Sequence, residues 1–361
     1  MNRKQVQSVA IVGGGIIGMS IAWRLAKAAF SVAVIEKSTV GGEASWAGAG
    51  MLAPGGEIDE PSPLAPLAIE SRQLYRDFVR ELEDASGLFI DYQECGGLDL
   101  AYSQEEWQAL EACATRQLAL GIESKPLTAK QVGSFWPRIR TEGLTGARFY
   151  PGDAIVNPRE VVLALAAACR QLGVAVVQNC AVESLAVTDQ GVELQTGCGR
   201  ESHSSAVIAA GAWSSSVGVT GLPPLPAAEP IKGHIIGYQQ PEQTCNTIVR
   251  YGGSYLLQRA SGLLLVGASM ERAGFDRQIH PDRVAALASQ AAFILPHLGE
   301  TEPTETWIGF RPGSDSLHVG RWHSDRLYLA YGHFRNGILL APLTAEQIVA
   351  EMKRCSNPAG D

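Results

Sequence analysis

Apolar residues recur along this chain with two spacings, and the alternation between them marks the first elements. Residues 8–12 and 31–35 are short runs of β-branched and small apolar residues, and each run predicts a buried β-strand. Between them, apolar residues at helical spacing predict one face of a helix: Ile16, Ile17, Ile21, Ala22 and Leu25. Residues 8–36 are therefore predicted to form a βαβ unit, the building block of a parallel sheet.

The same two patterns continue past the middle of the chain. A helix is expected over residues 67–82, and another begins after the cap residue Ser103. Asn157 and Pro158 form a typical start for a third helix, expected over residues 161–172. Short apolar runs predict further strands at residues 96–102, 174–177 and 206–213, the last ending in a small-residue turn.

The pattern changes after Leu222, where several prolines precede alternating or apolar runs. These runs predict strands of an antiparallel sheet: residues 235–238, 255–257 and 263–266. A Pro-Gly turn is expected after Arg311, then a strand over residues 327–330 and a closing helix from Ile338.

The order of these segments predicts an α/β protein of two domains, one inserted into the other. The first is a Rossmann-like, nucleotide-binding domain of residues 1–90, 150–220 and 315–361. The second is an α+β substrate domain of residues 91–149 and 221–314, built on an antiparallel sheet.

The turn after the first strand carries the sequence GGGIIG at residues 13–18, and the second strand ends on Glu36. In this fingerprint Gly13 allows a tight turn, Gly15 lets the backbone approach a pyrophosphate, and Gly18 lets the helix pack closely on the strand. The helix N-terminus attracts phosphates, and Glu36 can accept hydrogen bonds from a ribose. An ordinary glycine-rich turn is the weaker alternative. The pattern predicts a bound adenine dinucleotide without deciding which one.

Composition narrows the partners and the location. The 361 residues, 46% hydrophobic and 18% charged, are typical of an ordinary globular protein, and a net charge of −8 without a basic run argues against nucleic acid. No apolar run reaches the roughly 18 residues of a membrane span. Residues 2–4 resemble the start of a signal peptide, but cleavage would remove the phosphate-binding glycines. A cytoplasmic location is therefore predicted.

The seven cysteines are scattered and form no CxxC pair, and the seven histidines show no ligand spacing such as HExxH. This argues against a disulfide framework and against a zinc or iron–sulfur site, so no metal is expected.

A second glycine-rich turn distinguishes the dinucleotides. Residues 332–337 open the closing helix, far along the chain from the fingerprint. A helix N-terminus there is useful if it faces the pyrimidine end of a flavin, where negative charge develops on reduction. Taken alone, this turn favours the alternative of a helix preceded by an ordinary turn.

Together with the small-residue segment 41–53, these motifs resemble those of the D-amino-acid-oxidase-like FAD-dependent oxidoreductases, and within that family most closely the glycine oxidases of thiamine biosynthesis. The resemblance covers essentially the whole chain and is densest in IVGGGIIG, GGEASWAGAGML, GDAIVNP, PIKGH, LVGASM, GFRPGSDS and GHFRNGILLAP. It departs at His234, where the family often has Gln or Glu, and no role is assigned to that position.

The resemblance implies FAD, bound non-covalently by residues from both ends of the chain. The fingerprint glycines are expected at the pyrophosphate, Glu36 at the ribose and the backbone of Val182 at the adenine. Residues 45–51 are expected at the phosphates and the isoalloxazine, and residues 332–339 at the pyrimidine edge. The expected cofactor contacts are Gly13, Gly15, Ile16, Ile17, Gly18, Glu36, Lys37, Ser45, Ala49, Gly50, Met51, Val182, Gly211, Trp213, His333, Arg335, Asn336, Gly337, Ile338 and Leu339.

A planar guanidinium suits a carboxylate, and Arg311 after an apolar strand is a candidate, with a surface salt bridge as the alternative. The resemblance implies that Arg311 binds the substrate carboxylate and that Tyr255 bonds the substrate through its hydroxyl. A packed, half-buried strand tyrosine is the alternative. Arg335 is implied beside the flavin loop. Met51 and Met270 are expected as apolar walls, although methionines more often fill gaps in a core.

The implied activity is FAD-dependent oxidative deamination of glycine and other small amines, such as sarcosine and small D-amino acids. The products are the imine or 2-oxo acid, ammonia and hydrogen peroxide, and the glycine imine would supply thiamine thiazole synthesis. A small amino acid and molecular oxygen are the expected partners, and a homo-oligomer is expected. Three alternatives stay open: a flavin dehydrogenase with a non-oxygen acceptor, an NAD-dependent dehydrogenase, and a non-catalytic flavin-binding module.

Overall fold

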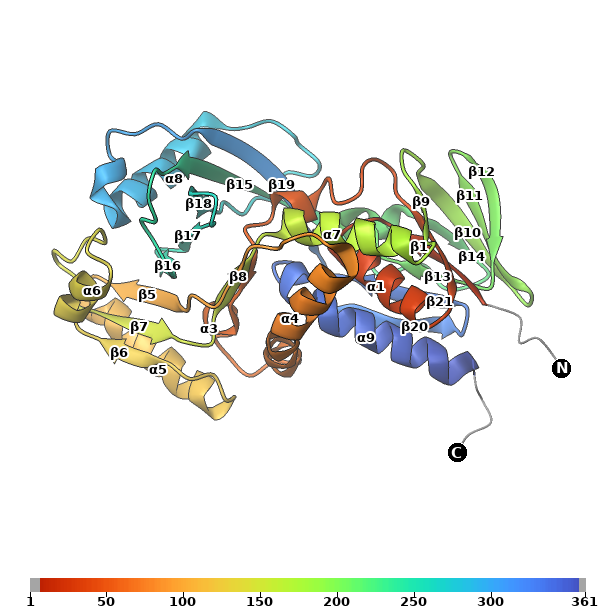
Figure 1. The fold of residues 1–361 in the computed structure, drawn as a ribbon, viewed down its shortest axis with the longest axis horizontal. Helices are drawn as coiled ribbons and strands as arrows, with labels where there is room; N and C mark the ends of the chain where they lie inside the picture. The colour runs from red at the N-terminus through yellow and green to blue at the C-terminus, as the bar shows by residue number, and fades with distance from the viewer. Residues whose placement is uncertain (1–6, 357–361) are drawn as a thin grey trace.

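The computed structural model describes residues 7–356, so residues 2–4, discussed above as a signal-like start, lie outside the described residues. The right-hand part of the molecule in Figure 1 is built on a six-stranded sheet of order β20-β21-β13-β1-β2-β9. All neighbouring strands are parallel except β20 and β21. The strands are β1 (Ser8–Val12), β2 (Ser31–Ile35), β9 (Ala175–Val177), β13 (Ser205–Ile208), β20 (His318–Ser324) and β21 (Leu327–Tyr331).

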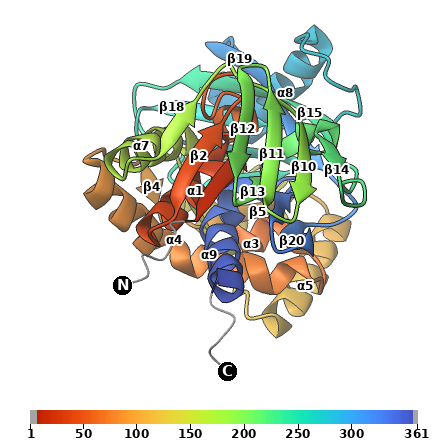
Figure 2. The same ribbon diagram turned by 90° about the vertical axis from the view of Figure 1, so that its right-hand side faces the viewer.

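Both faces of this sheet are covered, which explains why its strands are apolar on both sides. Val9 and Ile11 of β1 pack against helices, whereas Ala10 and Val12 pack against a smaller four-stranded sheet, drawn in green in Figure 2. The helices are α1 (Ile16–Lys27), α4 (Leu64–Ser86), α7 (Pro158–Gln171) and α9 (Gly337–Ser356). The smaller sheet comprises β10 (Val182–Thr188), β11 (Gly191–Thr196), β12 (Gly199–His203) and β14 (Gly218–Thr220).

The helix starts predicted from cap residues are confirmed. The Ser103 hydroxyl accepts the N–H of Glu106, and the Glu106 carboxylate accepts the N–H of Ser103, which closes a capping box at the start of α5 (Gln104–Ala119). Asn157 caps α7 by accepting the N–H of Arg159, with Pro158 in the first helical position.

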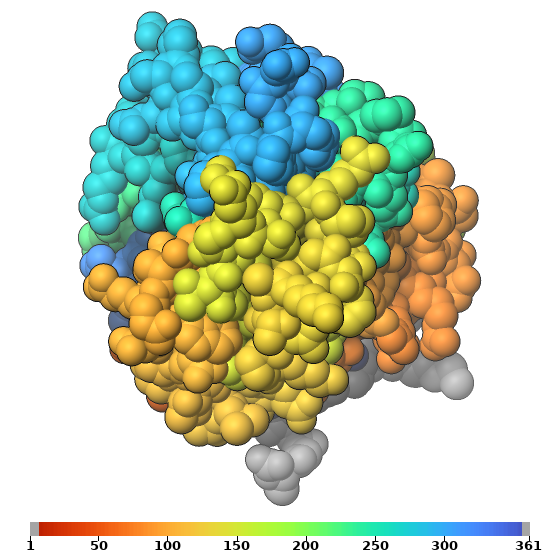
Figure 3. Space-filling model, turned by 90° about the vertical axis from the view of Figure 1, so that its left-hand side faces the viewer, coloured from red at the N-terminus to blue at the C-terminus, as the bar shows by residue number. Residues whose placement is uncertain are grey.

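The left-hand part of the molecule is built on an eight-stranded sheet of order β19-β15-β18-β17-β16-β5-β7-β6, antiparallel except where β16 meets β5. It combines strands from both segments of the predicted substrate domain, and Figure 3 shows these two stretches of chain against each other. The strands are β5 (Gly97–Ala101), β6 (Lys125–Leu127), β7 (Gly146–Tyr150), β15 (Glu229–Gln239), β16 (Ile248–Tyr251), β17 (Ser254–Gln258), β18 (Leu263–Gly267) and β19 (Glu305–Gly313). The accompanying helices are α5, α6 (Ala129–Phe135), α8 (Pro281–Ile294) and the 3₁₀ turn η2 (Pro296–Leu298).

Short elements connect the two parts and carry much of the small-residue sequence. A three-stranded sheet of order β3-β8-β4 lies between them (Figure 1). The connecting elements are α2 (Ala44–Ala47), β3 (Met51–Leu52), α3 (Pro54–Glu57), β4 (Tyr92–Gln93), β8 (Ala154–Val156) and the 3₁₀ helix η1 (Gly211–Ser216).

Two local predictions were wrong. The strand expected over residues 206–213 ends at Ile208, because Gly211 has a φ of +57° and starts the 3₁₀ helix η1. The Pro-Gly turn expected after Arg311 is instead the end of β19, where Pro312 pairs with Pro230. β19 is an edge strand, and an edge tolerates a proline that cannot donate to a ladder.

The part of the chain that the structure describes has no helix both long and apolar enough to cross a bilayer. Nor do His, Cys, Asp or Glu side chains within residues 7–356 form a group of three that could hold a metal ion.

Candidate active site

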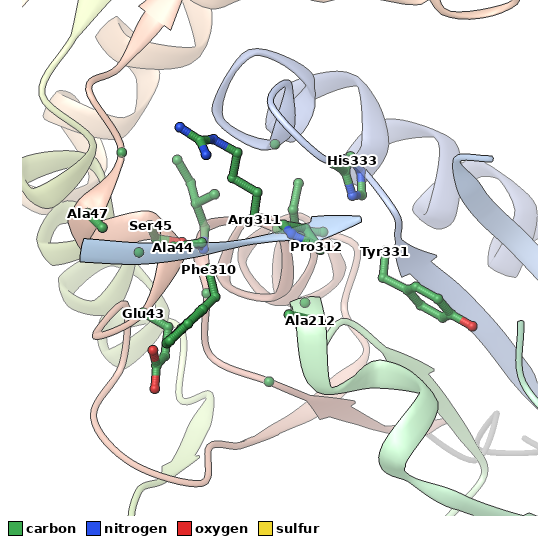
Figure 4. A pocket seen from close by; sticks show the side chains of 18 of the residues that line it. Glu43, Ala44, Ser45, Ala47, Ala212, Phe310, Arg311, Pro312, Tyr331 and His333 are labelled. Atoms are coloured by element: carbon green, nitrogen blue, oxygen red, sulfur yellow. Dashed lines mark hydrogen bonds between the residues drawn. The ribbon is translucent and has the colours of Figure 1, made fainter. Parts of the chain in front are cut away.

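A cavity of about 380 Å³ lies where the parallel sheet, the eight-stranded sheet and the connecting segments meet. Figure 4 shows Arg311 on β19 at this cavity, with Ser45 and His333 on neighbouring segments. Of the predicted site residues, only Gly18 and Leu339 lie outside the lining. Those that line it are Gly13, Gly15, Ile16, Ile17, Glu36, Lys37, Ser45, Ala49, Gly50, Met51, Val182, Gly211, Trp213, Tyr255, Arg311, His333, Arg335, Asn336, Gly337 and Ile338.

The glycines after β1 allow three close approaches of backbone. Gly13 has a φ of +106°, and a Cβ there would lie 2.5 Å from the carbonyl oxygen of Ala209. A Cβ at Gly18 would lie 2.0 Å from the Gly13 carbonyl oxygen, so Gly18 lets α1 pack against the turn. A Cβ at Gly15 would meet only the hydroxyl of Ser45, at 3.3 Å, so this part of the turn is open to the cavity.

Glu36 is fixed at the cavity by the backbone around it. One carboxylate oxygen accepts the N–H of Gly14 at 2.7 Å, and the other accepts the N–H of Ser38 at 2.8 Å. The second oxygen also accepts the hydroxyl of Ser38 at 3.2 Å. The oxygen bound to Gly14 can accept a further hydrogen bond, so the side chain keeps acceptor capacity for a ribose hydroxyl.

The small-residue segment after β2 forms a second wall with a constrained backbone. The Ser45 hydroxyl accepts the N–H of Ile16 at 2.9 Å and so ties this segment to the start of α1. Gly50 has a φ of +93°, and a Cβ there would lie 1.8 Å from the carbonyl oxygen of Val156. The N–H groups of Ala49 and Gly50 donate to no acceptor among the residues described. They are therefore available to a ligand.

The N-terminus of α9 forms a third wall. Leu340 donates its N–H to Asn336, and the N–H groups before it have no intrahelical acceptor. The hydroxyl of Ser71 donates to the Leu339 carbonyl at 2.7 Å, which fixes this turn although Leu339 itself lies outside the lining. With α1, two helix N-termini and two free N–H groups face one elongated cavity, a donor set that fits the pyrophosphate and the pyrimidine edge of FAD.

Lys37 and Trp213, both predicted site residues, lie together on one side of the cavity. The Lys37 ammonium is 3.0 Å from the centroid of the Trp213 ring, and burial lowers the pKa of Lys37. Trp213 also stacks on Phe275 at a centroid distance of 4.5 Å. Phe275 was missed because it belongs to an irregular loop, in which no periodic pattern indicates a contact.

At the other end, Arg311 on β19 and Tyr255 on β17 occupy space left by glycines of neighbouring strands. A Cβ at Gly233 would lie 2.4 Å from a guanidinium nitrogen of Arg311, and a Cβ at Gly267 would lie 2.4 Å from the Tyr255 hydroxyl. The glycines in PIKGH and LVGASM therefore provide the room for two large polar side chains.

Both side chains are suited to an anion. Burial lowers the pKa of Arg311 from its usual value, against the attraction of Tyr255, and burial raises the pKa of Tyr255, which keeps its hydroxyl a donor. Arg311 donates to the carbonyl of Ser269 at 3.1 Å. The Ser269 hydroxyl in turn accepts the N–H of His234 at 2.9 Å. His234, to which no role was assigned, therefore helps to hold the residue whose carbonyl binds Arg311.

Glu57 is a cavity residue that sequence reasoning missed. Its carboxylate accepts a hydrogen bond from Arg335 at 2.8 Å, and burial raises the pKa of Glu57 against the opposing effect of Arg335. Its short helix, α3, is held by Asp153, which accepts the N–H of Gly55 at 3.1 Å. Asp153 and Arg335 lie 98 and 278 residues from Gly55 and Glu57 in sequence, and no local motif indicates either contact.

His333 provides a pH-dependent stability that can be measured. It is buried beside Thr344, 3.0 Å from its hydroxyl, and burial lowers its pKa to about 3. An unfolded histidine titrates near pH 6.5, so the unfolded state takes up the proton first as the pH falls. The stability contributed by neutral His333 is present above about pH 6.5 and is lost at about 1.4 kcal/mol per pH unit below it.

Urea unfolding of the native protein and of His333→Asn between pH 7 and pH 4 measures this contribution. We expect the difference in unfolding free energy between the two proteins to shrink steadily over that range. Parallel pH profiles would show that His333 is not buried in its neutral form.

Comparison with known proteins agrees with this geometry. Residues 8–352 match the DAO family model, described as FAD dependent oxidoreductase. The chain is 35% identical over 358 residues to a glycine oxidase of Geobacillus kaustophilus, with 98% of this chain and 94% of that protein covered. It is 32% identical to the bifunctional protein ThiO/ThiG of Synechocystis, where the match covers 94% of this chain and 50% of that protein.

Solved structures extend the similarity to the fold. The crystal structure of glycine oxidase from Geobacillus kaustophilus superimposes with a TM-score of 0.91 at 34% identity, over 97% of this chain and 95% of that one. The predicted fold class is thereby confirmed, and the family match confirms an enzyme that depends on FAD. The chain belongs to the DAO family of FAD-dependent oxidoreductases.

Proposed function

We propose that this enzyme oxidises glycine and other small amines, such as sarcosine and small D-amino acids, with non-covalently bound FAD and molecular oxygen. The overall reaction converts glycine, oxygen and water into glyoxylate, ammonia and hydrogen peroxide. The observation that supports this proposal is the position of Arg311 and Tyr255, which line the same cavity as the unpaired N–H groups of Ala49 and Gly50.

Charge counting in the cavity supports a substrate with one carboxylate. The Arg335 guanidinium is paired with Glu57, whereas Arg311, within the described part of the chain, donates only to a neutral carbonyl. Of these two arginines, Arg311 is therefore the one left for the substrate, and a bidentate guanidinium–carboxylate contact also fixes the orientation of the α-carbon.

FAD, when bound, supplies the chemistry by accepting a hydride from the α-carbon of the substrate. Arg311 binds the carboxylate, and the Tyr255 hydroxyl donates to it. Tyr255 is buried and Arg311 is half-buried, so the substrate amine loses its proton in a site that is largely shielded from bulk water. The residues contribute orientation and desolvation, and no side chain is assigned as an obligatory base.

A peroxide-coupled screen of small amines on the holoprotein tests the proposal. We expect hydrogen peroxide with glycine, sarcosine and small D-amino acids. Turnover only with an artificial electron acceptor would favour the dehydrogenase alternative. If light reduces the bound FAD but no amine does, the result would favour the non-catalytic flavin-binding module. The NAD-dependent alternative is removed by the family match.

Replacement of Glu57 by glutamine is expected to change substrate preference. It frees the charge of Arg335, so a second anionic group on the substrate gains a partner. We expect the ratio of kcat/KM for D-aspartate to that for glycine to rise about tenfold or more, which is roughly 1.4 kcal/mol. Steady-state peroxide assays measure this ratio. An unchanged ratio would contradict the charge count.

The ThiO/ThiG relative supports a place before thiazole formation in thiamine synthesis. We propose that the glycine imine is the product used there, and trapping of the imine by a thiazole-forming enzyme in a mixed assay tests this. The cytoplasmic location, the homo-oligomer and the division into a FAD-binding and a substrate-binding domain stay predictions.

A further inference from the structure

Three side chains from distant parts of the sequence bind the backbone carbonyls of residues 46–49, the segment along one wall of the cavity. Arg159 donates to the first carbonyl at 3.0 Å and Trp307 donates to the second at 3.0 Å. Arg259 donates to the third and fourth, those of Gly48 and Ala49, at 3.4 and 3.2 Å. The carbonyl side of this segment is thus bound by the protein.

The two carbonyls that Arg259 binds belong to the peptide groups whose N–H groups are free. The Gly48 carbonyl shares its peptide group with the N–H of Ala49, and the Ala49 carbonyl shares its peptide group with the N–H of Gly50. In a trans peptide the N–H points opposite to the carbonyl, and the single cis bond among the described residues lies elsewhere, after Gly267. With Arg259 on the carbonyl side, these N–H groups point away from it, and Ala49 and Gly50 line the cavity.

Among residues 7–356, no carboxylate forms an ion pair with Arg259. Its side chain is 6% exposed, and its second terminal nitrogen has no hydrogen-bond partner among residues 7–356. By contrast, Arg250, whose side chain is 12% exposed, pairs with both Asp99 and Asp153. Burial lowers the pKa of Arg259 to about 10, so it remains a cation at neutral pH. Its charge also reaches the cavity, where it favours the ionised form of Tyr255.

We propose that Arg259 is a positioning residue that turns the N–H groups of Ala49 and Gly50 toward FAD and, through these polarised peptide groups, raises the reduction potential of FAD. A buried cation stabilises the negative charge that develops on reduction, and a peptide group whose carbonyl is bound by a cation donates more strongly through its N–H. This inference rests on the FAD dependence of the family and not on the identity of the amine.

The midpoint potential of the bound FAD, measured by equilibration with reference dyes, tests the proposal. For Arg259→Gln we expect the equilibrium constant of the two-electron reduction to fall at least tenfold, which is about 30 mV. Arg159→Gln is the matched control. Arg159 binds the carbonyl of Trp46, whose peptide group includes the N–H of Ala47, and that N–H already donates to the carbonyl of Glu43 at the start of α2. For Arg159→Gln we expect the equilibrium constant of the two-electron reduction to change less than threefold.

Two outcomes would overturn the proposal. One is an Arg259→Gln protein that holds FAD at the wild-type potential, and the other is an equal shift in the Arg159→Gln control. Arg259→Lys keeps the test decisive if the glutamine variant does not fold. A buried lysine loses its proton at lower pH than arginine. The potential of Arg259→Lys should therefore fall increasingly below that of the wild type from pH 7 to pH 9, and parallel profiles would contradict the proposal.

Discussion

Replacement of Arg311 by leucine is expected to raise the KM for glycine by roughly 10²–10⁴-fold while FAD stays bound. Removal of one partner from a buried ion pair costs about 3–5 kcal/mol, and each 1.4 kcal/mol is a factor of ten. Arg311 is half-buried at the cavity, and among residues 7–356 it donates only to the neutral carbonyl of Ser269, so its charge is available to the substrate. Steady-state kinetics with glycine, together with the FAD content of the purified variant, measure both parts of this expectation.

Arg272→Leu is the matched control. Arg272 lies near the same end of the molecule, but its side chain is 79% exposed and it pairs at the surface with Glu229. We expect its KM for glycine to stay near the wild-type value, because exposed ion pairs contribute little. If Arg311→Leu shows normal kinetics, Arg311 does not bind the carboxylate and the substrate end of the site is wrongly assigned.

The second large effect is expected at Gly13. An alanine there must adopt a φ of +106°, outside the regions that side chains allow, and its Cβ would lie 2.5 Å from the backbone oxygen of Ala209. Strain and overpacking together cost about 3–5 kcal/mol, so we expect the Kd for FAD to rise at least roughly 10²-fold. Fluorescence titration of the apoprotein with FAD measures the change.

Gly87→Ala separates this effect from general strain. Gly87 ends α4 with a φ of +71°, and nothing lies within 4 Å of the Cβ that alanine would add. We expect it to lose about 1–2 kcal/mol of stability and to bind FAD normally. Wild-type affinity in Gly13→Ala would show that the turn after β1 does not carry the pyrophosphate.

The sequence could predict those parts of the site whose signals are local. The turn at residues 13–18 is specified by its own glycines between a strand and a helix, and the caps at Ser103 and Asn157 by residues within one turn. Local chemistry of this kind is readable without knowledge of the tertiary fold.

The residues that were missed depend on contacts between distant segments. Glu57 meets Arg335 across 278 positions, and Arg259 meets the carbonyl of Ala49 across 210. Pro312 was wrongly predicted in a turn. It is tolerated in β19 because this strand lies at the sheet edge, and that position is set by the pairing with β15 and not by the local sequence. Such contacts follow from sheet order, which no local pattern specifies.

Anaerobic addition of glycine to the holoprotein tests the central claim most directly, because it needs no assumption about oxygen. If Arg311 and Tyr255 hold the amino acid at the cavity that binds FAD, one equivalent of glycine reduces the bound FAD completely, and the visible absorption of the oxidised cofactor disappears. If the bound FAD stays oxidised in excess glycine, and in excess sarcosine and small D-amino acids, the cavity is not a site of amino-acid oxidation.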